Sequence, residues 1–296
     1  MNDNQYVDFI VNNCEAYQAA GLWSRPPRVN PRGWLQNFQE DEKPAAAAIL
    51  DRLCFFSATA IDNLLRASFL GYISKRHTMS LGFGESRQSY DSLMSDLKWT
   101  DIQGESPHKT DSGNFFLRKA RDTLSIKEEV IVNQIAAISN VISDKKVMFI
   151  DDFIGTGDQV IETWKREYSY LTFEDVVGQK SGLASMLCLV ATRSGLDRIR
   201  HEEIQLDIFP AHIVDDSDSI QNFRSKPFAP PSASLSSIKK LLCKYGPQLD
   251  VPVYVDARYG YRSLGLTIAF EHSVPDATLP IIWAMGGNNW QRLVEI

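Results

Sequence analysis

The chain has 296 residues, with 31 Lys and Arg against 37 Asp and Glu, a net charge of -6 and 44% hydrophobic residues. Its 17 Gly and 13 Pro are too few for a collagen-like or low-complexity polymer. The acidic balance argues against a broad nucleic-acid-binding surface, which is normally basic, although it does not exclude a local basic patch. The length fits about two domains, or one large α/β domain with an appendage.

The cysteines and the apolar runs indicate the class of protein. The four cysteines lie far apart and form no C-x-x-C pair, so we expect reduced thiols and neither a disulfide framework nor a zinc site. The first residues contain no basic and apolar signal segment, and no apolar run reaches the roughly 18 residues of a membrane span. We therefore expect a soluble cytoplasmic protein.

In the first part of the chain, residues 1–44 are expected to form an extended arm, because the X-Pro steps within 23–43 disfavour a helix. Apolar residues then recur every three or four positions over 45–75, which predicts helix, although residues 54–57 could instead form a short strand.

Further helices are predicted at about 88–98 and 115–123, separated by a loop at 104–114 that is rich in turn residues. Ser125 and Glu128 have the spacing of a capping box, which predicts a helix that runs from there to about residue 142.

The periodicity then changes to strands that alternate with helices. Apolar runs at 147–150 and 184–191 are typical of strands buried on both faces of a parallel sheet, and each is followed by a turn and a helical pattern. Residues 204–208 are a further strand candidate. These units predict an α/β fold with a mainly parallel sheet flanked by helices.

The C-terminal part is expected to be richer in strands. After a short helix at 236–245, strands are predicted at 251–255, 264–270 and 279–283. We therefore expect three consecutive parts, which are an N-terminal arm at 1–44, a core at 45–210 and a β-rich cap at 211–296 that packs on the core.

The segment VMFIDDFIGTGDQ at 147–159 carries the clearest chemistry. A buried strand would bring Asp151 and Asp152 to the carboxyl edge of the sheet, where open α/β sheets bind ligands. The turn Gly155-Thr156-Gly157 and the helix after it would direct backbone N–H groups toward an anion. Two carboxylates beside an anion site suit a ligand with hydroxyls and a phosphate, such as a ribose 5-phosphate.

This segment resembles the phosphoribosyl-diphosphate signature of type I phosphoribosyltransferases, which have four apolar residues, two acids, two apolar residues and a small-Thr-Gly turn. The resemblance implies that Asp151 and Asp152 contact the ribose and steady an oxocarbenium-like transition state. It also implies that residues 155–159, from Gly155 to Gln159, hold the 5′-phosphate, with Mg²⁺ bound mainly by the substrate diphosphate and hydroxyls.

Three other interpretations compete with this one. Two acids after a strand also resemble a Walker B segment, but the chain contains no G-x-x-x-x-G-K-[ST] loop. A receiver-type phosphoacceptor pocket would not need the glycine turn, and a strand-to-helix turn with an acidic cap would need no ligand. The motif also departs from the signature, since Asp158 and Gln159 replace small or hydroxyl residues. Either Asp158 faces away from the loop, or the pocket prefers a less charged ligand.

A wider resemblance covers most of the chain after about residue 34. The pieces WLQNF (34–38), TDSGNFFLRKAR (110–121), FIDDFIGTGDQ (149–159) and FEHSVPDATLPIIW (270–283) are similar to phosphoribosyltransferase-like proteins of prokaryotic defence systems, including retron-associated ones. This resemblance implies an effector or regulator of a multi-gene antiphage system, with other proteins and a DNA or RNA component as partners.

The cation that neutralises a diphosphate would come from Lys109 on the 104–114 loop or from Arg118 beyond it, although 118–121 could equally be a solvated helix face. The turn that binds diphosphate cannot be placed, and residues 57–59 are a weak candidate. The five histidines share no metal-binding spacing, and only His108 is a candidate for catalysis.

Two functions from different classes remain open. The first is an effector enzyme that acts on phosphoribosyl diphosphate, a nucleotide or a related N-glycoside, for which the adjacent acids argue. The second is a regulator that senses a nucleotide without turnover and gates a partner. A nucleic-acid-associated scaffold is a third possibility, against which the acidic total weighs.

Overall fold

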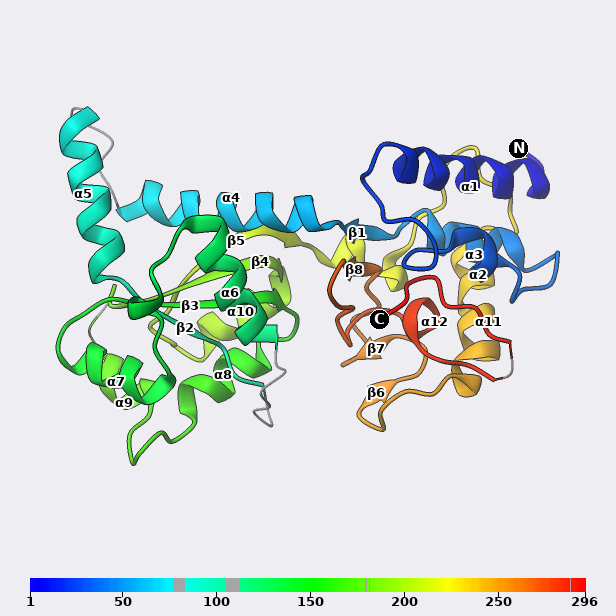
Figure 1. The fold of residues 1–296 in the computed structure, drawn as a ribbon. Helices are drawn as coiled ribbons and strands as arrows, with labels where there is room; N and C mark the ends of the chain where they lie inside the picture. The colour runs from blue at the N-terminus through cyan, green and yellow to red at the C-terminus, as the bar shows by residue number, and fades with distance from the viewer. Residues whose placement is uncertain (77–82, 105–111, 179, 181, 288) are drawn as a thin grey trace. The chain divides into compact units, whose positions relative to one another are not determined.

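The computed structural model describes residues 1–76, 83–104, 112–178, 180, 182–287 and 289–296. The chain forms two compact units, one from residues 1–61 with 215–296 and the other from residues 62–214 (Figure 1). The second unit is thus inserted in the sequence of the first. This division differs from the three consecutive parts expected from the sequence, because the two ends of the chain share one hydrophobic core. Among the described residues, no helix has the length and apolar character needed to cross a membrane.

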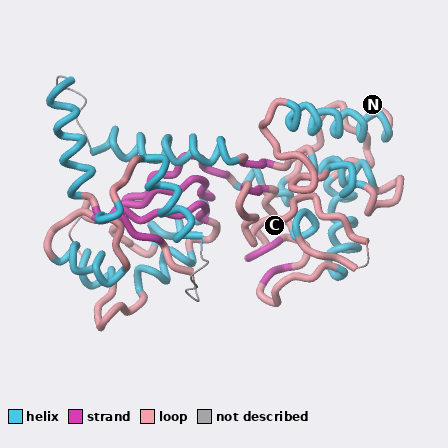
Figure 2. Tube along the Cα trace, in the orientation of Figure 1, coloured by secondary structure: helices cyan, strands magenta, loops and turns pink. Residues whose placement is uncertain are grey.

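The second unit is built on a parallel sheet. Its strands are β2 (Lys98–Asp101), β3 (Val147–Ile154), β4 (Ala184–Thr192) and β5 (Asp207–Val214). They lie in the order β2-β3-β4-β5, and all three neighbouring pairs are parallel. Figure 2 shows the sheet among its helices. The α/β fold with a parallel sheet flanked by helices is therefore confirmed.

Helices cover both faces of this sheet. They are α4 (Ala58–Arg76), which contains the boundary between the units, α5 (Phe83–Asp96), α6 (Ser112–Leu124), α7 (Gln134–Ile142), α8 (Asp158–Lys165), α9 (Phe173–Val177) and α10 (Arg193–His201), with a 3₁₀ turn, η1, at Glu128–Val130. Residues of α7, α8, α9 and α10 share one cluster with Phe149 of β3. On the other face, Phe69 of α4 contacts Trp99 of β2 with ring centroids 5.9 Å apart.

The first unit has a mainly helical core. Its elements are α1 (Asp3–Ala19), α2 (Pro31–Leu35), α3 (Lys43–Leu50), β1 (Cys54–Phe56), η2 (Asp216–Asp218), η3 (Ile220–Asn222), α11 (Leu235–Tyr245), η4 (Gly246–Gln248), β6 (Val255–Asp256), β7 (Gly260–Tyr261), β8 (Ile268–Phe270) and α12 (Pro280–Trp283). Strand β1 pairs with β8 in parallel, and β6 pairs with β7 in antiparallel fashion.

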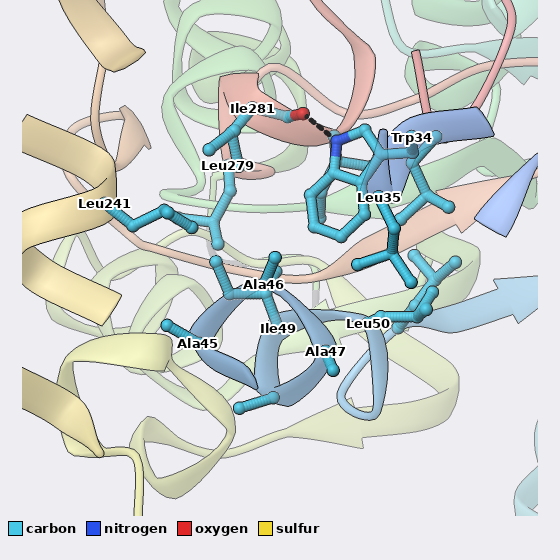
Figure 3. Packing of buried hydrophobic residues seen from close by; sticks show 14 of the residues in the cluster. Trp34, Leu35, Ala45, Ala46, Ala47, Ile49, Leu50, Leu241, Leu279 and Ile281 are labelled. Carbon is cyan, nitrogen blue, oxygen red and sulfur yellow. Dashed lines mark hydrogen bonds between the residues drawn. The ribbon is translucent and has the colours of Figure 1, made fainter. Parts of the chain in front are cut away.

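The core of this unit forms around α3, whose residues 44–50 are all buried (Figure 3). Four consecutive alanines give this helix a narrow profile, so neighbouring elements approach it closely. Trp34 of α2 is fully buried, and its Nε1–H donates a 2.8 Å hydrogen bond to the carbonyl oxygen of Ile281. Residues from both ends of the chain therefore close a single core.

Some elements differ from those predicted by the sequence. The expected extended arm contains α1, because Asn2 caps the helix and exchanges hydrogen bonds with Gln5 before any proline occurs. The predicted strand at 279–283 is the helix α12, which Pro280 opens at a position where its missing N–H costs nothing. The alternative strand at 54–57 is present as β1 and divides the predicted 45–75 helix.

The capping box predicted at residues 125–128 is wrong. Ser125 has a left-handed φ of 57° and opens no helix, while residues 128–130 form only η1. Helix α7 begins instead at Gln134, where the side chain of Asn133 accepts a hydrogen bond from the N–H of Ala136. The N-cap of this helix is therefore Asn133, eight residues after Ser125.

Candidate functional site

The two adjacent acids lie at the carboxyl end of β3. The strand continues to Ile154 and therefore includes Asp151 and Asp152, which the sequence placed just after it. Asp151 pairs in register with Cys188 of β4, and the backbone N–H of Asp152 donates to Oδ1 of Asp151 at 2.9 Å. The two residues are only 3% and 7% exposed, so both acids are nearly buried at this end of the strand.

The turn after β3 leads directly into α8. Gly157 is the N-cap residue with a left-handed φ of 81°, and an added Cβ would lie 2.9 Å from Cγ1 of Ile199. Because glycine has no side chain, no N-cap side chain accepts from the N–H groups of the first turn of α8. The N–H of Asp158 donates to the Thr156 hydroxyl at 3.4 Å, and the next N–H groups of this turn are suited to bind an anion at the helix N-terminus. Gln159 is exposed in this first turn.

A second turn, at residues 192–195 where β4 leads into α10, supports the first, a role that the sequence analysis did not predict. The Thr192 hydroxyl at the end of β4 donates a hydrogen bond to the carbonyl oxygen of Gly155 and accepts one from the N–H of Gly195 at 2.9 Å. An added Cβ at Gly195 would collide with that same carbonyl oxygen. The sequence could have indicated this proximity, because Thr192 ends a neighbouring parallel strand and must therefore lie at the same sheet edge as residues 151–157.

Asp158 has partners on both sides. Its Oδ1 lies 2.5 Å from Nη1 of Arg198 on α10, and its Oδ2 accepts a 2.7 Å hydrogen bond from the Thr156 hydroxyl. Arg198 also donates to the backbone oxygen of Thr156 at 3.4 Å. The negative charge that departs from the phosphoribosyl signature is thus compensated by a neighbouring helix, an arrangement that differs from both alternatives considered from the sequence.

The other residues predicted for the site are Arg118, Lys109, His108 and the segment 57–59. Arg118 is exposed on α6, while Lys109 and His108 lie outside the described residues. Residues 57–59, the candidate for a diphosphate turn, belong to the first unit, where Ser57 precedes α4 and the next two residues begin that helix, whereas the first strand of the parallel sheet is β2. Lys119, next to Arg118, is half-buried and forms an ion pair with Asp62 at 2.8 Å.

Strand β2 was not predicted, and it contributes a third acid to this sheet edge. Asp101 ends β2, is 7% exposed, and accepts a 2.7 Å hydrogen bond from Nε2 of Gln134. Two residues shortly after Asp101 are bound by α8 and its C-cap residue. The Thr163 hydroxyl donates to the Gln103 carbonyl at 3.0 Å, and Arg166 donates to the Gly104 carbonyl at 2.8 Å. Helix α8 therefore anchors the start of the segment that follows β2.

Burial and the two acids determine the chemistry of the neighbouring thiol. Complete burial, followed by the charges of Asp151 and Asp152, raises the pKa of Cys188 well above its usual range. The thiol is therefore protonated at neutral pH and is suited neither to nucleophilic attack nor to metal binding. Among the residues that the structure describes, no group of three or more His, Cys, Asp and Glu is placed to hold a metal ion.

Comparison with known families agrees with this geometry. The family model PRTase-CE, which is phosphoribosyltransferase-like, matches residues 31–295. The chain belongs to the PRTase-CE family. The PRTase-CE match includes the acids of β3, the Gly-Thr-Gly turn and the bracing turn at 192–195, as well as most of the first unit. No curated protein matches the chain.

Proposed function

We propose that this PRTase-CE protein binds the ribose 5-phosphate part of phosphoribosyl diphosphate, a nucleotide or a related N-glycoside, and acts on the anomeric bond of that ligand. One observation carries the proposal. Two adjacent carboxylates at the carboxyl end of a parallel strand precede a glycine turn whose helix leaves its first N–H groups without an N-cap side chain. Acceptors for the ribose hydroxyls and N–H donors for the phosphate therefore follow one another along the chain at one end of the sheet.

In this proposal Asp151 and Asp152 accept hydrogen bonds from the ribose hydroxyls, and their negative charges stabilise the positive charge that develops on the ring. Such preorganised electrostatic stabilisation contributes more than proton transfer when the bond to the leaving group breaks early. The backbone of residues 155–159 binds the 5′-phosphate. Asp158 is compatible with this role because Arg198 compensates its charge.

Mg²⁺ would assist by neutralising a diphosphate. Asp151 and Asp152 are oxygen ligands of the kind that Mg²⁺ prefers, but the described residues contain no cluster that would form a complete protein site. The chemistry of the donor set therefore favours an ion held mainly by the substrate diphosphate and hydroxyls, with these carboxylates nearby.

The proposed biological role is an effector of a bacterial antiphage defence system in the cytoplasm, with other proteins and a DNA or RNA component as partners. This role rests on the resemblance of the four sequence segments to defence-associated proteins. A nucleotide-sensing regulator is the second candidate, and the burial of the two carboxylates favours it. A pocket that must open before its ligand reaches the acids is suited to couple binding to a conformational change.

Calorimetry tests the binding step directly. The full chain is titrated with phosphoribosyl diphosphate, ribose 5-phosphate, AMP and NAD, with and without Mg²⁺, beside Asp151→Asn/Asp152→Asn and Asp158→Ala variants. Asp144→Asn is the control, since this exposed acid precedes the same strand. We expect wild type, Asp158→Ala and the control to bind at least one ligand and the double variant to lose it.

Binding that is equal in the double variant and the control, or no binding by any protein, would contradict the ribose pocket. Turnover then separates the two candidates. Release of base or diphosphate by wild type, absent in the double variant, supports the enzyme, whereas binding without release supports the regulator.

A further inference from the structure

A cavity of about 360 Å³ lies in the first unit, between α1 and the chain from the end of α3 to the start of α4. Its volume is within the roughly 300–1,000 Å³ of typical small-molecule pockets. The aromatic rings of Tyr17 and Trp23 line it, with centroids 5.3 Å apart and planes inclined by 52°. Rings in such a wall favour a planar, unsaturated ligand.

Asp51 also lines this cavity. Its side chain is 14% exposed, and its Oδ1 and Oδ2 lie 2.8 and 2.6 Å from Nζ of Lys226. Burial, followed by the charge of Asp51, raises the pKa of the lining Cys14 thiol to about 12. Since Lys226 already compensates this charge, a cationic ligand would gain little, whereas the remaining lone pairs can accept from a neutral N–H donor.

A side-chain amide completes the set. Asn13 of α1 lines the cavity and is partly exposed, and among the described residues no hydrogen bond uses its side chain. The amide can donate and accept, so the cavity offers a carboxylate acceptor together with a free amide between aromatic and apolar walls.

We propose that this cavity binds a guanine base, as part of a nucleoside or nucleotide. Guanine is planar and neutral, and its edge presents N1–H and N2–H donors beside the O6 acceptor. The donors match the carboxylate of Asp51, and O6 matches the amide N–H of Asn13. Adenine presents a different order of groups and leaves one polar group of the cavity without a partner, which costs affinity. The site lies in a different unit from the sheet edge and does not depend on the proposed function.

Calorimetry of the full chain with guanosine, inosine and adenosine tests this assignment. Inosine lacks only the 2-amino group, so we expect wild type to bind guanosine about tenfold more tightly than inosine, the usual size of one hydrogen bond to a charged group. Asn13→Ala should weaken guanosine binding about tenfold, while Asn12→Ala, at an exposed position of the same helix, should not.

Asp51→Asn is expected to remove the preference for guanosine over inosine, and circular dichroism shows whether the variant is folded. If Asp51→Asn does not fold, the comparison of Asn13→Ala with Asn12→Ala tests the proposal without it. Failure of wild type to bind guanosine, equal affinity for guanosine and inosine, or equal effects of Asn13→Ala and Asn12→Ala would overturn the proposal. Retained guanosine binding in the Asp151→Asn/Asp152→Asn variant keeps this test separate from that of the ribose pocket.

Discussion

The two units of this protein are assembled in opposite ways. The second unit is one continuous stretch of chain, residues 62–214, in which strands pair with their neighbours in sequence. The first unit joins the two ends of the chain, since β1 pairs with β8 and Val29 forms a bridge with Val294. Closing so long a separation costs chain entropy, which buried contacts must offset. The candidate site therefore belongs to a unit whose strands pair with their neighbours in sequence, whereas the first unit depends on packing between distant parts of the chain.

The largest effect is expected from a substitution that disrupts the long-range packing at the centre of the first unit. Trp34→Ala should lower the free energy of unfolding of this unit by about 3–5 kcal/mol, because it empties a fully buried site and leaves the Ile281 carbonyl without its donor. Urea unfolding followed by circular dichroism measures the loss.

Trp34→Phe is the matched control, since it keeps an aromatic ring and removes the N–H, and it should cost less than Trp34→Ala. A loss below about 1 kcal/mol for Trp34→Ala would show that the ends of the chain are held together by other contacts.

Local signals allowed much of the second unit to be predicted. The buried strands at 147–150 and 184–191, the acids and the glycine turn follow from consecutive residues, and the structure places them at one sheet edge. Strand β2 was missed because it has four residues, two of them charged. The hydrogen bond from Thr192 to Gly155 and the ion pair of Arg198 with Asp158 were missed because they join residues about 40 positions apart.

The first unit was harder to predict for a physical reason. The proline steps indicated an extended arm, but the conformation of that segment depends on contacts with residues near the other end of the chain. One example is the Leu293 carbonyl, which accepts a hydrogen bond from the N–H of Asn30. Helix α12 contains residues with high strand propensity and became helical where it packs into the shared core.

A smaller effect is expected where the second unit braces its own site. Gly195→Ala places a Cβ against the Gly155 carbonyl oxygen, so the two turns must separate at a cost of about 1–3 kcal/mol. Ribose 5-phosphate binding, measured by calorimetry, should weaken at least tenfold in a protein that remains folded.

Gly287→Ala is the control for this substitution, because among the described residues no heavy atom beyond those of its chain neighbours lies within 4 Å of the position that its Cβ would take. Unchanged binding in Gly195→Ala would mean that the bracing turn does not set the shape of the phosphate loop.

The smallest expected effect separates charge from shape within the site. Arg198→Gln leaves the carboxylate of Asp158 uncompensated at the N-terminus of α8, where it would repel a phosphate. We expect affinity for ribose 5-phosphate to fall about tenfold, and more at low salt than at high salt. Arg200→Gln is the matched control, since this exposed arginine of the same helix pairs with Asp197 at 2.7 Å.

The Arg198→Gln/Asp158→Asn double variant decides the cause of that loss. If the uncompensated charge is responsible, removing it should restore most of the wild-type affinity, since the double variant lacks both members of the pair. If the double variant binds as weakly as Arg198→Gln alone, Arg198 itself contacts the phosphate. Asp158 would then hold the guanidinium in position for the ligand, and the departure from the phosphoribosyl signature would be part of the binding site.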